Sequence, residues 1–187
     1  MGIQLDPLIA TLIAVSLLVL AKITFIKVRS DYTKLNGLSK PVAFFQTGYF
    51  CIYALSSYLF LDSRFFIINL QEIYLLFKIL LMVVGISIVM FSMPILGRRS
   101  FGHSIGNLHS TGLYRYSRNP QLVGSFIFII GYCFLWPSWN GFLWGLLWLP
   151  ISYMMIKAEE EHLLNVFGVE YENYRKKTAC IFGFPKK

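Results

Sequence analysis

The sequence predicts an all-α, polytopic membrane protein with about five transmembrane helices. Hydrophobic residues make up 56% of its 187 residues and charged residues only 14%, whereas ordinary globular domains have about 45–50% apolar and about 25% charged residues. The apolar residues gather in five runs, and the basic residues gather between these runs. This composition excludes a secreted disulfide scaffold and a disordered chain, and it places any active site at the membrane.

Three of the apolar runs lie in the first half of the chain. Pro7–Ile26 is longer than a signal-peptide core of about 7–15 residues, so we predict a retained helix that begins at a proline. Val42–Leu61 is the second run and follows a polar linker over Arg29–Lys40. The third run, Ile73–Met93, is predicted to end at Pro94, because proline removes a helical hydrogen bond.

The second half contains a predicted helical hairpin. A polar stretch over 95–119 precedes apolar runs at Pro120–Trp136 and Gly141–Ile156, which a short turn connects. Each run has about 16 or 17 residues, near the lower limit for crossing a hydrocarbon core. We expect residues 1–93 to form three transmembrane helices, and residues 94–187 to supply a cofactor-binding loop, the hairpin and a cytoplasmic segment within one integral domain.

Charged residues follow the last apolar run without a break. From Glu159 to about Lys177, apolar side chains recur at steps of three and four opposite a polar face, which is helical periodicity. These side chains are Leu163, Leu164, Phe167, Tyr171 and Tyr174. The pattern predicts an amphipathic helix that lies against the cytoplasmic interface or caps the bundle. A solvated anchoring helix without chemistry is the alternative.

The basic residues predict the orientation. Of the 17 lysines and arginines, five lie from Lys22 to Lys40, four from Arg98 to Arg118 and six from Lys157 to Lys187. Basic loops are retained on the cytoplasmic side, so five spans place the N-terminus outside and the C-terminus in the cytoplasm. A prokaryotic inner membrane or an endoplasmic reticulum membrane fits. The net charge of +8 is explained by these loops and does not indicate a nucleic-acid partner.

The sequence Arg118-Asn119-Pro120 predicts a helix start. Asn119 is a favourable N-cap whose side chain can accept a hydrogen bond from a free backbone N–H, and proline suits the first helical position. The start of a helix carries partial positive charge, so with Arg118 beside it this end could hold a carboxylate. The alternative is that Asn119 only caps the helix and Arg118 only reaches lipid phosphates.

Other polar residues near the interface are candidates for binding. Consecutive helical residues point about 100° apart, so at least one of Glu159, Glu160 and Glu161 should face the bundle, unless all three form a solvated face. Tyr114 and Tyr116 could stack on a base or only anchor the interface. His103, His109 and His162 each have an explanation in a loop or on the surface, although His109 lies near Arg118 in the sequence.

Several motifs are absent, and small residues have a packing explanation. The three cysteines form no metal-ligand spacing, and we find no G-x-G-x-x-G, G-x-x-x-x-G-K-[ST] or H-E-x-x-H sequence. We therefore expect no metal site and no soluble-type nucleotide fold. Gly141 and Gly145 in the fifth run, with Gly124 and Gly131 in the fourth, indicate close packing within the hairpin rather than dimerisation.

Two sequence segments together resemble the isoprenylcysteine carboxyl methyltransferase and phospholipid methyltransferase superfamily. The first segment is TGLYRYSRNPQLVG, residues 111–124, and the second begins at Glu159-Glu160 and continues through Phe167-Gly168 and Glu170-Tyr171 to Tyr174. The family pattern is T-G-x-Y-x-x-x-R-H-P-x-Y-x-G, a hairpin, then E-E-x-x-L-x-x-x-F-G-x-E-Y-x-x-Y. The similarity covers residues 94 to 185. The two segments at this separation are a more specific match than either segment alone.

The resemblance implies transfer of a methyl group from S-adenosylmethionine, bound on the cytoplasmic side, to a lipophilic acceptor that enters from the bilayer. The implied cofactor-binding residues are Tyr114, Arg118, Asn119, Pro120, Gly124, Glu159 and Glu160. Arg118 and His109 are the candidates for a catalytic role, with His109 as a proton acceptor if the methyl acceptor is an amine or a neutral thiol. The chain departs from the pattern at Asn119, where the family has histidine, and at Leu122, where it has tyrosine.

Two other functions remain open at this point. The C-terminal halves of membrane sterol reductases resemble this region and bind a reduced nicotinamide cofactor, although the chain is short and has the tandem glutamates instead of the longer reductase pattern. A non-catalytic membrane module is the other possibility, with Asn119 and Leu122 as marks of lost activity. The acceptor, a carboxylate, a thiol or a lipid amine, and the oligomeric state are not indicated by the sequence.

Overall fold

The chain is all-α throughout the residues that the computed structural model describes, 5–61, 73–100 and 108–184, with the backbone alone at Leu61, Ile73 and 95–100. The elements are α1 (Pro7–Leu35), α2 (Lys40–Leu61), α3 (Ile73–Ser100), the 3-10 turn η1 (Gly112–Arg115), α4 (Pro120–Leu135), α5 (Trp139–Phe167) and α6 (Val169–Lys177). The predicted all-α class is confirmed. The expected positions of α2 and α4 are correct to within two residues.

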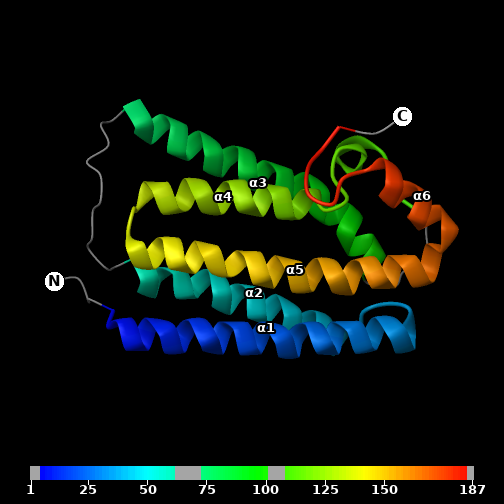
Figure 1. Ribbon diagram of the computed structural model, residues 1–187, viewed down its shortest axis with the longest axis horizontal. Helices are drawn as coiled ribbons and strands as arrows, with labels where there is room; N and C mark the ends of the chain where they lie inside the picture. The colour runs from blue at the N-terminus through cyan, green and yellow to red at the C-terminus, as the bar shows by residue number, and fades with distance from the viewer. Residues whose placement is uncertain (1–4, 62–72, 101–107, 185–187) are drawn as a thin grey trace.

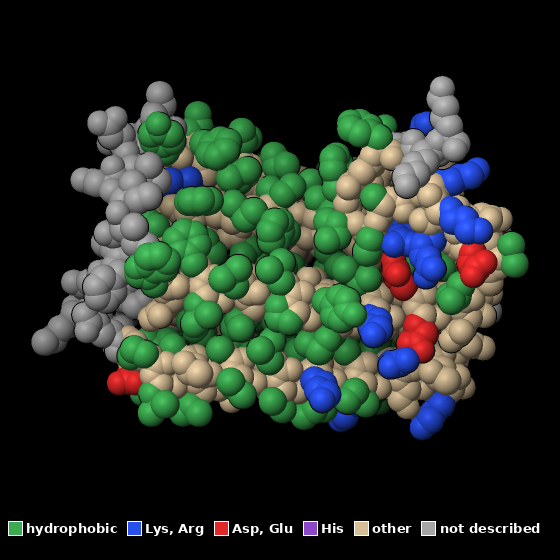
Figure 2. All heavy atoms as spheres, viewed as in Figure 1, with side chains coloured by type: hydrophobic (Ala, Val, Ile, Leu, Met, Phe, Trp, Pro, Cys, Tyr) green, Lys and Arg blue, Asp and Glu red, His purple; other side chains and the backbone are tan. Residues whose placement is uncertain are grey.

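The five long helices lie side by side along the long axis of the molecule (Figure 1). The α1–α2 connection, the end of α3, the start of α4, the end of α5 and all of α6 meet at one end of this bundle. Lysine, arginine and acidic side chains gather at the same end, while apolar side chains cover most of the visible face (Figure 2). The packing thus brings the basic segments of the sequence together at one end.

The surface of the bundle is apolar where a soluble protein would be polar. Three helices are long and apolar enough to cross a membrane, over Pro7–Leu35, Tyr74–Pro94 and Trp139–Phe167, and α4 is a shorter apolar helix. Large apolar side chains point outward, among them Leu76 and Phe91, each 75% exposed. Apolar faces of this extent on long apolar helices are typical of a membrane-embedded bundle. The chain is therefore an integral membrane protein.

Two helices extend beyond their predicted ends. The prediction that the first helix ends at Ile26 is wrong: α1 continues to Leu35 and ends where Asn36 adopts a left-handed conformation, with φ 50°. Lysine and arginine favour helix as well as leucine does, so polarity alone did not end it. The prediction that Pro94 ends the third helix is also wrong, because α3 continues to Ser100; one proline kinks a helix without necessarily ending it.

The fifth helix and the tail divide differently from the prediction. Helix α5 continues without interruption from Trp139 to Phe167, so the segment from Glu159 to Phe167 belongs to it and not to a separate tail helix. The break falls at Gly168, whose φ of 51° lies in the left-handed region that glycine adopts without strain. Only Val169–Lys177 forms α6. The acidic residues of α5 are therefore held rigidly by a long helix.

The glycines of α4 pack against α3 and not within the hairpin. A Cβ atom on Gly85 of α3 would lie 2.5 Å from the backbone nitrogen of Phe128, and one on Gly124 would lie 2.7 Å from the Gly85 carbonyl oxygen. Gly131 likewise approaches the Lys78 carbonyl oxygen of α3, at 2.9 Å. The hairpin explanation is therefore wrong for Gly124 and Gly131. It is correct for Gly145, whose added Cβ would meet Cys133 of α4 at 3.0 Å.

The core on the other side of α5 is formed with α1 and α2. Small residues of α1, Ala10, Ala14 and Ala21, are buried there and allow close approach. Tyr53 of α2 stacks on Trp144 of α5 with ring centroids 4.8 Å apart, and its hydroxyl donates to the Trp144 carbonyl oxygen at 3.0 Å. This stack joins α2 to α5.

Replacing Gly85 with alanine should destabilise the fold, because the new methyl group would overlap the α4 backbone, which cannot rotate away as a side chain does. Overpacking of this kind costs roughly 1–3 kcal/mol, so we expect a lower thermal midpoint in detergent. The matched control is Gly48→Ala on α2, where nothing lies within 4 Å of the added Cβ. Equal midpoints for the two variants would contradict the tight α3–α4 contact.

Candidate functional site

The loop before α4 is held by a buried tyrosine. The Tyr114 side chain of η1 is 1% exposed, and its hydroxyl donates to the Ser92 carbonyl oxygen of α3 at 3.3 Å. The Tyr114 carbonyl oxygen in turn accepts a 2.6 Å hydrogen bond from the Tyr174 hydroxyl of α6. This single residue therefore connects α3, the loop and α6 at the charged end of the bundle.

The segment after α6 returns to the start of α4 and pairs with the loop. The Arg118 backbone N–H donates to the Ala179 carbonyl oxygen, and the Gly183 N–H donates to the Tyr116 carbonyl oxygen, both at 3.0 Å. The Asn119 side-chain nitrogen donates to the Cys180 carbonyl oxygen, also at 3.0 Å. Backbone and side-chain bonds together fix the C-terminal segment over the first turn of α4.

Asn119 occupies the predicted N-cap position, but its side chain does not cap the helix. It makes no hydrogen bond to the first turn of α4, because its amide is turned toward Cys180. The backbone N–H of Asn119 donates to the Ser117 hydroxyl at 3.0 Å, and the residue is 2% exposed. The expected capping bond is therefore wrong, and the side chain attaches the C-terminal segment instead.

Arg118 and Glu160 form a buried ion pair at the centre of this region. Nη2 of Arg118 lies 2.9 Å from Oε1 of Glu160, and the two side chains are only 10% and 21% exposed. The other two guanidinium nitrogens, Nε and Nη1, are buried and have no hydrogen-bond partner within the described parts of the chain. Leaving buried charged donors unpaired is costly. The arginine therefore retains the capacity to bind an anion alongside Glu160.

The other two glutamates of the predicted run face different surroundings. Glu159 is 9% exposed and lies inside the bundle. Glu161 pairs with Arg29 of α1 at 2.6 Å, with both side chains largely exposed, and such surface pairs contribute little to stability. The expectation that at least one glutamate faces the bundle is confirmed by Glu159 and Glu160.

Two further groups lie in the electrostatic field of the ion pair. Burial raises the pKa of the Tyr171 phenol, and Glu160 raises it further. Burial also raises the pKa of the Cys180 thiol; Glu160 acts in the same direction, while Arg118 acts in the opposite one. The Sγ atom of Cys180 lies 3.8 Å from Oε1 of Glu160. Both groups therefore stay protonated at neutral pH.

The structure gathers some of the predicted residues and separates others. Arg118, Asn119 and Glu160 meet around Cys180, and Pro120 is buried beside them in the first turn of α4. Gly124 is turned toward α3, as described above.

The aromatic and histidine candidates occupy a wider area. With Tyr114 buried, Tyr116, at 41% exposed, has the more accessible ring. The imidazole ring of His109 contacts the Tyr114 ring edge-on, with the two ring centroids 5.9 Å apart. His162 is buried and stacks on Tyr32 of α1, and His103 lies outside the described residues.

Cys180 and Tyr171 lie beside the ion pair but are not among the site residues predicted from the sequence. The cysteines have no metal-ligand spacing, and Tyr171 is predicted only as part of the apolar helical stripe and of the family pattern. Cys180 is 61 positions from Asn119, so no local pattern connects them. A weak signal was present in Tyr171, which is a tyrosine in both this chain and the family pattern.

An apolar cavity lies beside this polar region. It has a volume of about 430 Å³, and α2, α3, α4 and α5 all contribute to its lining. Phe50 and Cys51 line it from α2, Val89 and Met93 from α3, Gln121 and Leu122 from α4, and Trp148 and Met155 from α5. Gln121 and Leu122 lie in the first turn of α4, next to Pro120 and Asn119 in the sequence, so one end of the cavity lies at the start of this helix.

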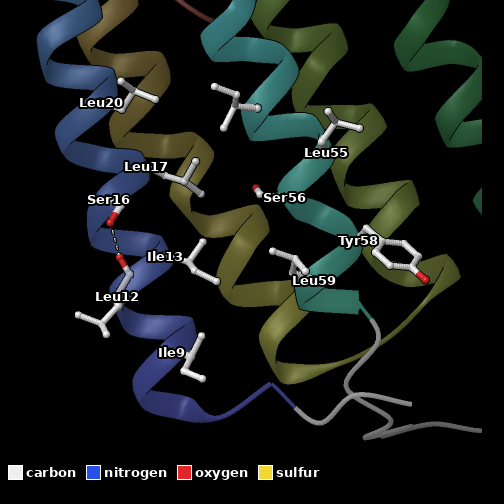
Figure 3. Close-up of a pocket in the computed structure, with 11 residues that line it drawn as sticks. Ile9, Leu12, Ile13, Ser16, Leu17, Leu20, Leu55, Ser56, Tyr58 and Leu59 are labelled. Carbon is white, nitrogen blue, oxygen red and sulfur yellow. Dashed lines mark hydrogen bonds between the residues drawn. The ribbon is translucent and has the colours of Figure 1, made fainter. Parts of the chain in front are cut away.

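A second depression lies between α1 and α2 (Figure 3). Its volume is about 660 Å³, and its lining is almost entirely apolar. The hydroxyl of Ser16 donates to the Leu12 carbonyl oxygen at 2.8 Å, drawn as a dashed line in Figure 3, and that of Ser56 donates to the Tyr53 carbonyl oxygen at 2.7 Å. Because the lining is apolar and both serine hydroxyls are paired within their own helices, this depression resembles the other apolar faces of the bundle.

The fold and the site together define a polytopic membrane protein with a buried ion pair at the end of an apolar bundle. Residues 73–170, more than half of the chain, match the model of the phospholipid methyltransferase family. The chain belongs to this family. The matched region includes α3, α4, α5 and both members of the ion pair, and the resemblance inferred from residues 111–124 and from the tandem glutamates is confirmed.

A curated relative supports the same assignment. The chain is 34% identical over 87 residues to a protein-S-isoprenylcysteine O-methyltransferase of Schizosaccharomyces pombe. The alignment covers 42% of this chain and 37% of that protein, so the chain spans only part of the length of its relative. No solved structure matches the chain significantly.

Replacing Glu160 with glutamine should lower the pKa of the Cys180 thiol, because the carboxylate that raises it is removed while Arg118, which lowers it, remains. The thiolate is the reactive form, and its fraction changes about tenfold per pKa unit. We therefore expect faster maleimide labelling at a fixed pH and a pH–rate profile displaced to lower pH, measured with Cys51 and Cys133 replaced by serine.

Arg118→Met is the matched variant for this measurement, and it should displace the labelling profile to higher pH. The two profiles should lie on opposite sides of the parent profile. A slower reaction in Glu160→Gln would contradict the proximity of this carboxylate to the thiol.

Proposed function

We propose that the protein transfers a methyl group from S-adenosylmethionine to a lipophilic acceptor that reaches the site from the bilayer. The observation that carries the proposal is the buried Arg118–Glu160 pair, which lies inside the region matched by the phospholipid methyltransferase family and retains unused donors. The Schizosaccharomyces pombe relative is named as a methyltransferase that acts on an isoprenylated cysteine, which is the same reaction class.

The residues present fit the amino-acid end of such a methyl donor. Its carboxylate is matched by Nε and Nη1 of Arg118, which are buried without a partner, and by the positive end of the α4 dipole. Its ammonium and ribose hydroxyls are matched by the carboxylates of Glu159 and Glu160. Tyr116, with its exposed ring, is better placed than Tyr114 to contact a base.

The bound donor supplies an electrophilic methyl group, and the chain supplies alignment and exclusion of water. Arg118 and Glu160 bind and orient polar groups, and Asn119 holds the C-terminal segment over the start of α4. An acceptor that is already a carboxylate or thiolate needs no general base. For an amine or neutral thiol, His109 is the candidate proton acceptor.

Binding of the demethylated product, S-adenosylhomocysteine, should raise the thermal midpoint of the purified protein in detergent. At a ligand concentration 100 times Kd, mass action stabilises the folded state by about 2.7 kcal/mol. Arg118→Ala and Glu160→Ala should each abolish most of this shift, because each removes a direct ligand contact. Arg115→Ala is the control, since this exposed arginine one turn away should leave the shift intact.

The pattern of shifts separates the possible functions. A shift with reduced nicotinamide adenine dinucleotide phosphate and none with S-adenosylhomocysteine would replace the proposal with a reductase. No shift with either ligand would favour a non-catalytic module. A shift that persists in both Arg118→Ala and Glu160→Ala would place the methyl-donor site elsewhere in the chain.

We also infer that the charged end of the bundle lies in the cytoplasm, where a water-soluble methyl donor is available. The excess of lysine and arginine at this end supports the orientation. A green fluorescent protein fused after residue 187 should therefore fluoresce in bacterial cells, and alkaline phosphatase at the same position should be inactive. The reverse result would place this end on the opposite side of the membrane.

A further inference from the structure

The apolar cavity between α2 and α5 contains polar groups of two kinds. Most are already paired with atoms of the lining helices. Thr47 donates to the Ala43 carbonyl oxygen and Ser125 to that of Gln121, while Tyr53 and Trp144 bond to each other, as described above. These groups have no remaining need for a ligand.

Gln121 is different. Its side chain is part of the cavity lining and is 3% exposed, yet neither its amide nitrogen nor its amide oxygen has a hydrogen-bond partner in the described chain. The indole N–H of Trp148, which also lines the cavity, is buried and unpaired in the same way. Gln121 therefore presents one unpaired donor group and one unpaired acceptor to the cavity.

An unpaired amide in an apolar setting destabilises a fold, and an apolar side chain of similar size would avoid that cost. Folding alone thus gives no reason for glutamine at this position. A ligand that pairs with the amide would supply the missing hydrogen bonds.

The position of Gln121 connects the cavity to the proposed reaction. It lies in the first turn of α4, three residues after Arg118 and two after Asn119. The remaining lining is predominantly apolar, and a volume of about 430 Å³ falls within the range of small-molecule sites. A molecule lying in the cavity would therefore have its hydrocarbon part among the helices and a polar group at Gln121, in the first turn of α4.

We propose that this cavity binds a lipophilic methyl acceptor that carries a primary carboxamide, and that Gln121 is the residue that recognises the amide. The inference names the acceptor class and in that respect rests on the proposed function; the methyl group passes to a separate carboxylate or thiolate of the acceptor, which displaces S-adenosylhomocysteine. A primary amide has an N–H on the same side as its C=O, so these two groups match the oxygen and nitrogen of the Gln121 side chain, and its carbonyl oxygen has a second lone pair for another donor.

Other polar groups fit this part of the cavity less well. A phosphodiester only accepts hydrogen bonds, so the Gln121 oxygen would stay unpaired, and an ammonium only donates, so the nitrogen would stay unpaired. An ion at this depth would also need a counter-charge, and no charged side chain lines the cavity among the described residues. A plain hydrocarbon would leave both amide atoms unpaired. Of these groups, the neutral primary amide is the one that pairs with both atoms together.

Fluorescence quenching tests the proposal directly. The probes are 9,10-dibromooctadecanamide and 9,10-dibromooctadecane, added to the purified protein in dodecyl maltoside. Trp136 and Trp139 are replaced by phenylalanine, so that the remaining two of the four tryptophans, Trp144 and Trp148, report from the cavity lining. Contact with bromine quenches their emission. The concentration of each probe at half quenching gives its apparent affinity.

In this background the amide should bind more tightly than the hydrocarbon by about fivefold or more, the equivalent of one net hydrogen bond. Gln121→Leu should reduce the ratio of the two affinities to about the value set by micelle partitioning alone. Ser125→Ala is the matched control, because the Ser125 hydroxyl bonds to the backbone oxygen of Gln121. It should retain the preference of the parent.

Two further readouts separate recognition from folding and from the methyl donor. Gln121→Leu should have a thermal midpoint equal to or above that of the parent, because it removes an unpaired buried amide. Gln121→Leu should also keep the stabilisation by S-adenosylhomocysteine. The two proposals are tested separately: a parent that does not bind S-adenosylhomocysteine would overturn the proposed function, and its preference for the amide probe could still be measured.

Three results would overturn the inference. The first is an unchanged affinity ratio in Gln121→Leu. The second is quenching of the parent that does not saturate with either probe. The third is a lower thermal midpoint for Gln121→Leu, which would show that the Gln121 amide already has a hydrogen-bond partner in the folded protein and cannot bond to a ligand.

Discussion

The ion pair between Arg118 and Glu160 is the interaction on which the organisation of the charged end depends. It joins the loop before α4 to the last turns of α5 in a place where both side chains are largely removed from water. Burying two charges is costly unless their remaining polar atoms are also paired. Two guanidinium nitrogens have no partner in the described part of the chain, so the pair retains hydrogen-bond donors that suit an anionic ligand.

The helices around this pair are arranged by contacts of two different kinds. Gly85 and Gly124 bring the α3 and α4 backbones into direct contact, whereas aromatic rings join α5 to α2. Because the glycine face of α4 is occupied by α3, a different face of α4, with Gln121 and Leu122, is left to line the cavity. The polar site and the apolar cavity therefore meet at the first turn of one helix.

Much of the fold could be predicted because it follows from local pattern. Consecutive residues determine the long apolar runs, the basic loops and the starts of α2 and α4. The two-part motif around Arg118 and Glu160 indicates the family. The errors fell at helix ends. Residues 27–35 continue α1, since the lysines and the arginine among them favour helix as well as leucine does, and Pro94 lies inside α3, so neither polarity nor a single proline determined where a helix stops.

The sequence by itself determined the membrane character, the helices, the charged end and the family, since each depends on composition or on spacing along the chain. Only the tertiary structure decided that Asn119 holds Cys180, that Gly124 faces α3, and that Gln121 remains unpaired within a cavity. Each of these features depends on whether residues far apart in the sequence are in contact. Apolar helices have faces that look alike in sequence, so their partners are known only once the helices are packed.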